Sequence, residues 1–206
     1  MKNLLFISLL TFTTSAAAID VSPYSAGQTL TDKQAKELQA RYKHRKQQAW
    51  KTVGGIDAIN KQSNAELIQY GVQVLDKTAA TIGPKNTDKS KRYSGNNLNC
   101  SSCHLKGNTQ LPGTKHDALP FTNVSNDYPQ FRSRNMSVIT AADRVNGCMT
   151  RSMGAGTPLP LDSKEMRGIL AYYDWLAEGT QKNLAMDGAG LPGIIFPTRS
   201  AGCDGG

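Results

Sequence analysis

The residues best suited to chemistry in this chain are the two cysteines and the histidine of the C-x-x-C-H stretch at residues 100–104. Two thiols separated by two residues can add across the two vinyl groups of one haem, and the histidine that follows supplies an imidazole for the iron. The stretch therefore predicts one covalently attached haem c, held by Cys100 and Cys103 and ligated by His104.

Two other interpretations of the same stretch are a thioredoxin-type thiol pair and half of a zinc site. A thioredoxin-type pair should follow a strand and open a helix in a βαβ unit, and the sequence gives no sign of such a unit. A zinc site would need a second pair of ligands, whereas the remaining cysteines, Cys148 and Cys203, stand alone. Haem attachment is the interpretation that the spacing favours.

The ligand on the other face of the iron would set the redox potential and reactivity of the haem. Met166 lies on an apolar stripe and His116 in a polar loop, so packing and solvent exposure account for them. A methionine is the usual ligand in small electron carriers, but an exported thiol such as Cys148 needs a partner, and cationic neighbours would hold it as thiolate. The candidates downstream of the motif are His116, Met136, Cys148, Met149, Met153 and Met166.

The first 18 residues have the features of an export signal. One positive charge (Lys2) precedes an apolar run at residues 4–10, and small residues at 15–18 suit cleavage near Ala18. The apolar run is too short to span a bilayer, for which about 20 residues are needed. We therefore expect a periplasmic protein that is not embedded in a membrane, with an uncleaved anchor as the alternative.

The composition indicates one domain with a basic surface. The formal net charge is +8, from 24 basic and 16 acidic residues. The basic residues are scattered, and their densest cluster, at residues 41–46, fits a solvated helix face, so nucleic acid is not an expected partner. A positive surplus of this kind favours acidic partners or small anions.

Helical periodicity and capping signals predict an all-α protein with a class I cytochrome c fold. A polar helix is expected over residues 32–51, and 106–134 should be loop-like. Better amphipathic helices are expected over 64–82, 141–149 and 163–178, and Gly71 would allow another helix to approach closely. The predicted organisation is a signal peptide (1–18), an N-terminal extension with a polar helix (19–63), a monohaem domain (64–180) and a Gly-rich tail (181–206).

Several motifs in register resemble the N-terminal haem domain of periplasmic thiosulfate dehydrogenases. The matching segments lie at residues 70–71, 96–105, 128–134, 138–140, 143–148, 151–153, 158–160 and 163–176. The resemblance implies that Cys148 ligates the iron opposite His104, and that Arg134 and Arg144 line a substrate cavity. It thus implies a catalytic set of Cys148, Arg134 and Arg144, acting on thiosulfate or tetrathionate.

The sequence departs from this family because it contains no second C-x-x-C-H motif. An electron leaving the haem would then pass directly to another periplasmic protein, which we expect to be a cytochrome. A disulfide between Cys148 and Cys203, with methionine as the iron ligand, is an alternative. Three functions are compatible with these observations: a thiosulfate-oxidising enzyme, an electron carrier without substrate, and a haem sensor or non-catalytic subunit.

Overall fold

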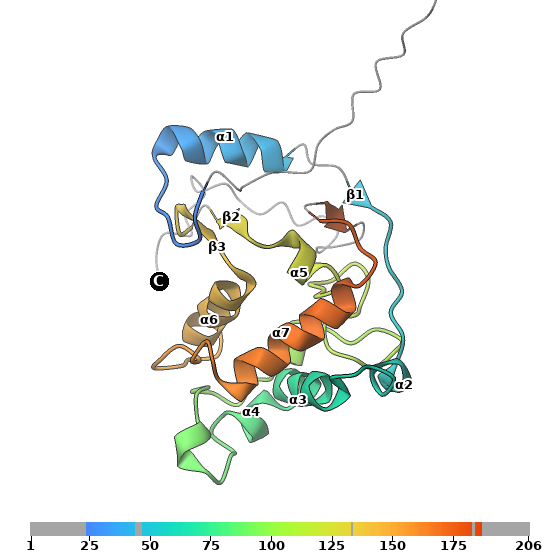
Figure 1. Ribbon diagram of the computed structural model, residues 1–206. Coiled ribbons are helices and arrows are strands. Elements are labelled where there is room, and N and C mark those ends of the chain that lie inside the picture. The colour runs from blue at the N-terminus through green and yellow to red at the C-terminus, as the bar shows by residue number, and fades with distance from the viewer. Residues whose placement is uncertain (1–23, 44–46, 133, 183, 187–206) are drawn as a thin grey trace, which may run out of the picture.

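The structure is a computed structural model that describes residues 24–43, 47–132, 134–182 and 184–186 (Figure 1). The predicted signal peptide and Cys203 lie outside these ranges. The elements are α1 (Asp32–Lys43), β1 (Gln47–Gln48), α2 (Ile56–Ile59), α3 (Ala65–Asp76), α4 (Thr78–Thr81), η1 (Lys89–Lys91), η2 (Cys100–Ser102), α5 (Val124–Asp127), β2 (Gln130–Arg132), β3 (Ser137–Ile139), α6 (Ala141–Arg151), α7 (Lys164–Ala177) and β4 (Ala185–Met186). No helix within the described ranges is long and apolar enough to cross a membrane.

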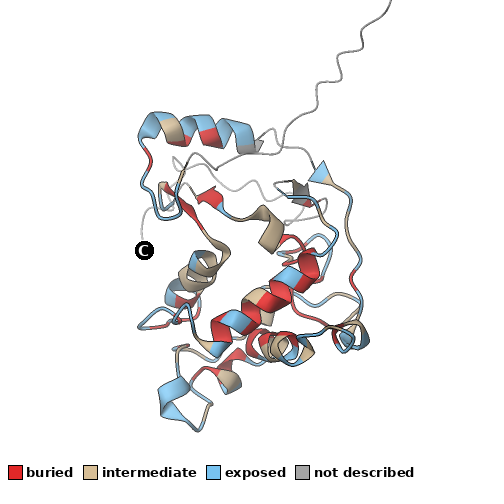
Figure 2. Cartoon of the chain, viewed as in Figure 1, coloured by how far each residue is buried: buried red, intermediate tan, exposed pale blue. Residues whose placement is uncertain are grey.

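Helix α7 runs through the middle of the molecule and crosses α3 (Figures 1 and 2). Most of α7 is buried, including Met166, Ile169 and Leu176, each at most 1% exposed. The crossing depends on two glycines, because a Cβ added to Gly71 would lie 2.0 Å from the carbonyl oxygen of Gly168. The close helix approach predicted at Gly71 is therefore present, and Gly168 is its counterpart.

Helices α6 and α7 begin at residues whose side chains cap them. Thr140 and Asp143 form a capping box at the start of α6. Ser163 accepts a hydrogen bond from the Met166 backbone at the start of α7, and Gly179 follows its end with φ +74°. These caps fix where α6 and α7 start.

The segment before residue 64 packs on a short antiparallel hairpin of β2 and β3. Leu30 lies just before α1 and Leu38 lies on it. Both pack with Phe131 and Val138 of the hairpin in a cluster separate from the main core. Backbone bonds from Leu30 N to Met136 O (2.7 Å) and from Gly27 N to Val138 O (2.7 Å) add a further edge to the hairpin. The segment therefore covers the outer side of β2 and β3, where α1 lies in Figure 1.

Two further contacts join the N-terminal segment to the end of α7. Strands β1 and β4 pair in parallel, with Gln47 opposite Ala185. Lys51 Nζ donates to the backbone oxygens of Leu176 (3.2 Å) and Glu178. Such bonds satisfy carbonyl groups that the end of a helix leaves without a partner.

The structure differs from the sequence-based expectations in several places. The single helix expected over 64–82 is divided into α3 and α4. The polar helix predicted over 32–51 ends at Lys43, and β1 follows it. The region 106–134, expected to be loop-like, contains α5 and β2. The four strands in the described part of the chain have two or three residues each, too few to produce a visible alternation of polar and apolar residues.

Candidate haem and active site

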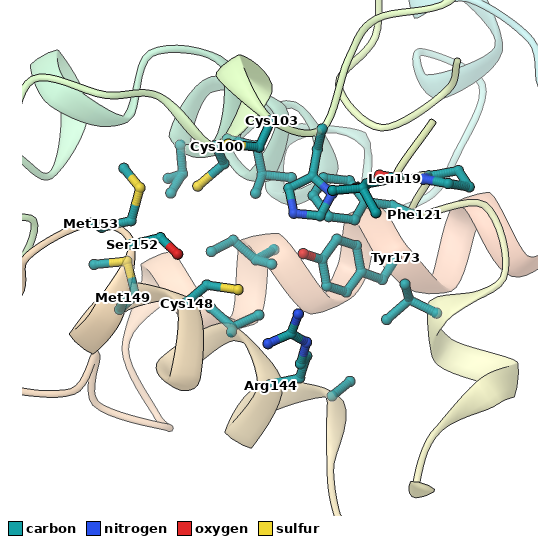
Figure 3. Close-up of a pocket in the computed structure, with 18 of the residues that line it drawn as sticks. Cys100, Cys103, Leu119, Phe121, Arg144, Cys148, Met149, Ser152, Met153 and Tyr173 are labelled. Carbon is teal, nitrogen blue, oxygen red and sulfur yellow. Dashed lines mark hydrogen bonds between the residues drawn. The ribbon is translucent and has the colours of Figure 1, made fainter. Parts of the chain in front are cut away.

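A cavity of about 280 Å³ lies between the C-x-x-C-H motif and α6, and its walls are mostly apolar. Figure 3 shows the side chains of Cys100 and Cys103 on one side of this space and those of Arg144 and Cys148 on the other. The apolar part of the lining comes chiefly from Val74, Leu75, Ile82, Leu98, Leu119, Phe121, Val145, Met149, Met153 and Ile169.

Cys100 is held at the junction of α3 and α4. Cys100 N donates to the buried Thr78 Oγ1 over 3.0 Å, and Cys100 Sγ lies 3.4 Å from the same oxygen. Asn99 and Ser102 form a capping box around the single turn η2, and Ala79 N donates to Asn99 Oδ1. Burial raises the pKa of the Cys100 thiol, and the Thr78 hydroxyl partly opposes this shift.

The orientation of His104 is fixed by its second ring nitrogen. Nδ1 lies 2.7 Å from the Leu119 carbonyl oxygen, so the neutral ring donates there and carries its lone pair on Nε2. The ring stacks on Phe121 at 4.1 Å between centroids, and Phe121 packs against Tyr173. Burial lowers the pKa of His104, the bond to Leu119 raises it, and Arg144 lowers it. A neutral imidazole with a free Nε2 is the form that binds iron.

The structure brings three of the six proposed iron ligands to the cavity: Cys148, Met149 and Met153. Cys148 is a half-buried free thiol, whereas Met149 and Met153 are 2% and 4% exposed and belong to the main apolar core.

The other three candidates do not line the cavity. Met166 is buried in the core, as its place on the apolar stripe predicted. His116 is exposed and pairs with Asp117 at 2.7 Å, and Met136 packs beside the hairpin cluster.

The two arginines implied by the resemblance lie in different surroundings. Arg144 lines the cavity and projects toward it from α6, near Cys148 and Tyr173 (Figure 3). Arg134 is exposed in the turn between β2 and β3 and is not among the lining residues. The lining instead includes Arg132, the last residue of β2.

Arg132 was missed by the sequence analysis, although a signal for it exists. Successive side chains of a strand point to opposite faces, so Phe131 and Arg132 must face different surroundings. Phe131 is apolar and packs toward the N-terminal segment, which leaves Arg132 on the cavity side.

Two tyrosines, Tyr128 and Tyr173, also line the cavity. Burial raises the pKa of Tyr128, while the charges of Arg132 and Arg144 lower it, so its phenol lies close to both guanidinium groups. Burial also raises the pKa of Tyr173 well above its ordinary value, with the nearby sulfurs of Cys100 and Cys148 adding to the shift. Both phenols are therefore neutral at physiological pH and can donate hydrogen bonds into the cavity.

These residues fit a haem c. The two thiols face an apolar cavity, His104 presents a free Nε2 from the same wall, and the candidate sulfur ligands line the opposite wall. The apolar walls would pack against the porphyrin ring. The neighbouring arginines could pair with the haem propionates or with an anion bound next to the haem.

Comparison with known proteins supports this assignment. Residues 89–181 match the family model described as SoxA/TsdA, cytochrome c domain. A thiosulfate dehydrogenase of Psychrobacter arcticus is 32% identical over 124 residues, which cover 60% of this chain and 34% of the relative. One of Stutzerimonas stutzeri is 37% identical over 105 residues, covering 51% of this chain and 31% of the relative.

A solved structure is similar to this chain in its fold. The thiosulfate dehydrogenase TsdBA from Marichromatium purpuratum, in its "as isolated" form, superposes with a TM-score of 0.60 at 27% identity. The match covers 72% of this chain and 31% of that one, so the chain spans about a third of the length of these relatives. The predicted all-α cytochrome c fold is confirmed by this superposition and by the match of residues 89–181 to the SoxA/TsdA cytochrome c domain.

Proposed function

We propose that this protein is a periplasmic c-type cytochrome that oxidises thiosulfate to tetrathionate, or catalyses the reverse reaction, and exchanges electrons with a partner cytochrome. The observation that carries the proposal is the placement of Cys148 and Arg144 on one side of α6, facing the thiols and imidazole of the haem-attachment motif across an apolar cavity. The relatives named above support the choice of substrate.

In the proposed site, Cys100 and Cys103 would hold a single haem, and His104 Nε2 and the Cys148 sulfur would supply ligands to its iron. When bound, the haem would supply one-electron redox chemistry beside the Cys148 sulfur. Two thiosulfate ions yield one tetrathionate and release two electrons, so two one-electron transfers to the partner complete each turnover. The role of the protein's own residues in this reaction is to attract the anion, orient its sulfur and exclude water.

Arg144 is proposed to hold the substrate anion. A guanidinium presents its donors in a planar fork that matches the oxygens of a sulfonate group, and each charge-assisted bond contributes roughly 1.5–3 kcal/mol. The low polarity of the surrounding wall strengthens this attraction. The role that the resemblance implies for Arg134 stays a prediction.

A second candidate function is electron transfer without substrate turnover. It is favoured by Leu105, which directly follows the motif, is 39% exposed and does not line the cavity. Apolar side chains beside a haem edge are suited to a transient contact with another redox protein. A non-catalytic sensor or subunit would use the same ligation without either activity.

The test is a steady-state assay of the holoprotein with thiosulfate and an artificial electron acceptor, and with tetrathionate and a donor for the reverse direction. We expect turnover in the wild type and a loss of about tenfold or more in kcat/KM for Arg144→Gln. Lysine at this position should restore only part of the activity, because an ammonium lacks the planar fork. The haem absorption spectrum of each variant serves as the control for folding.

Absence of turnover in both directions, even with a candidate partner cytochrome present, would reject the enzyme and leave the electron carrier or sensor.

A further inference from the structure

Arg132 is a charged residue of the cavity that none of the preceding proposals uses. It lines the cavity together with Arg144, and its Nη2 donates to the Tyr128 hydroxyl. Its guanidinium carbon also lies 5.5 Å from the centre of the Tyr128 ring, within the range of a cation–π contact. Two interactions with one tyrosine therefore hold this cation at the cavity wall.

The Nε–H of Arg132 is a hydrogen-bond donor that the described residues leave without an acceptor. The nitrogen atom is also buried. A buried donor without a partner is costly, and such groups in native proteins usually mark a missing water, ion or ligand. The donor belongs to a cation, so the missing group is best matched by an anionic oxygen.

Strand pairing fixes the backbone of Arg132, and this fixes the position from which its side chain extends. Arg132 pairs with Ser137 across the hairpin, and Ser137 in turn bridges to Thr29 of the N-terminal segment. Arg134, two residues later, lies in the turn that the bond from Asn135 N to Arg132 O closes over 3.0 Å. Arg132, on the strand, is thus placed at the cavity, and Arg134, in the turn, is placed at the surface.

The local charge also favours an anion. Asp127 is the acidic member of the described lining, and its carboxylate accepts a bond from Gln130 Nε2. Arg132 and Arg144 bring two positive charges to the cavity lining, and both act on the phenol of Tyr128 by lowering its pKa. Two guanidinium groups can share the oxygens of one sulfur oxyanion while its reactive sulfur stays free to face Cys148.

We propose that Arg132 is the second anion-binding residue of this cavity, acting with Arg144, and that Tyr128 is the residue that positions it. This inference deepens the proposed function and rests on it for the identity of the anion. A haem propionate is a second source of anionic oxygens, and the experiment separates the two.

The experiment measures binding of thiosulfate to the reduced holoprotein by isothermal titration calorimetry, after reduction with titanium(III) citrate and desalting under argon. Reduced haem without an acceptor cannot oxidise thiosulfate, so binding is read without turnover. We expect Arg132→Gln to weaken binding at least tenfold, because one charge-assisted bond is lost. Arg132→Lys should recover only part of this loss.

Two further variants sharpen the comparison. Tyr128→Phe keeps the ring under the guanidinium and removes the hydroxyl, so it should weaken binding by a smaller factor, about two- to tenfold. Arg167→Gln removes an exposed arginine of α7 and is the matched control, with affinity unchanged. The haem midpoint potential of each variant is measured in parallel.

Three results would overturn the proposal. In the first, the wild type binds no thiosulfate. In the second, Arg134→Gln weakens binding more than Arg132→Gln does. In the third, Arg132→Gln shifts the midpoint potential while affinity is unchanged, which would assign Arg132 to a propionate. Tight binding that depends on Arg132 in a protein without turnover would support this site while rejecting the enzyme.

Discussion

Cys148 and Met149 are neighbours on α6, yet their sulfur atoms have different surroundings. Cys148 is half-buried beside the arginine-lined wall, whereas Met149 is 2% exposed and packs in the main core. A methionine used for core packing is not free to bind a metal without leaving a void. This difference makes Cys148 the better candidate for the sixth ligand, although all three sulfur candidates line the cavity.

Substitution of each sulfur in turn tests this assignment. We expect Cys148→Gly to abolish the low-spin spectrum of a ferric haem with imidazole and thiolate ligands, and to raise the midpoint potential as thiolate donation is lost. Met149→Ala and Met153→Ala should retain the wild-type spectrum. Absorption and electron paramagnetic resonance spectra of the ferric holoproteins provide the measurement. If a methionine variant loses the spectrum instead, the ligand is that methionine, and a Cys148–Cys203 disulfide becomes the better account of the two remaining thiols.

At the scale of elements, the crossing of α3 and α7 is the contact most sensitive to a small change. Gly71→Ala would place a methyl group against the Gly168 carbonyl, and the helices would have to separate. We expect a loss of about 1–3 kcal/mol in the free energy of unfolding, despite the roughly 1 kcal/mol that alanine gains over glycine in a helix. Guanidinium denaturation of the holoprotein measures the difference.

The matched control for this crossing is Gly156→Ala, because a Cβ at Gly156 meets nothing within 4 Å. Its stability should equal that of the wild type within about 0.5 kcal/mol. Equal stability of Gly71→Ala and Gly156→Ala would mean that the helices can part at little cost.

Comparison of the elements with the sequence shows where local signals are sufficient. Helices α6 and α7 combine a capping side chain with a long apolar stripe, so their starts and buried faces could be predicted. Strands β2 and β3 are stabilised mainly by packing against residues such as Leu30 and Leu38, more than 90 positions earlier, which no local pattern reports. The alternation of Phe131 and Arg132 identifies Arg132 as a cavity residue only once β2 is known to be a strand, whereas Arg134 was chosen from a motif.

At the scale of the whole molecule, the separate apolar cluster under α1 suggests a local unit of stability. Leu38 is 1% exposed in that cluster and lies outside the main core. We expect Leu38→Ala to raise hydrogen exchange of the β2 and β3 amides strongly, since a Leu→Ala cavity costs about 2–5 kcal/mol, while the main core stays protected. Mass spectrometry of exchanged peptides would show this pattern.

The control for this experiment is Leu176→Ala, which opens a cavity in the main core and should increase exchange throughout α3 and α7. If Leu38→Ala instead loosens α3 and α7 as much as the hairpin, the two clusters form one cooperative unit. A selective effect on the hairpin would also show that the N-terminal segment holds the wall that carries Arg132.

The glycine crossing also has a consequence for the order of events during synthesis. Gly71 and Gly168 are about a hundred positions apart, so at roughly 5–20 residues per second the ribosome makes α7 some 5–20 s after α3. During that interval the apolar face of α3, with Ile68, Val74 and Leu75, has been made without the helix that buries it. A nascent chain in this state is a natural client for a chaperone, and the haem-attachment motif is translated within the same window.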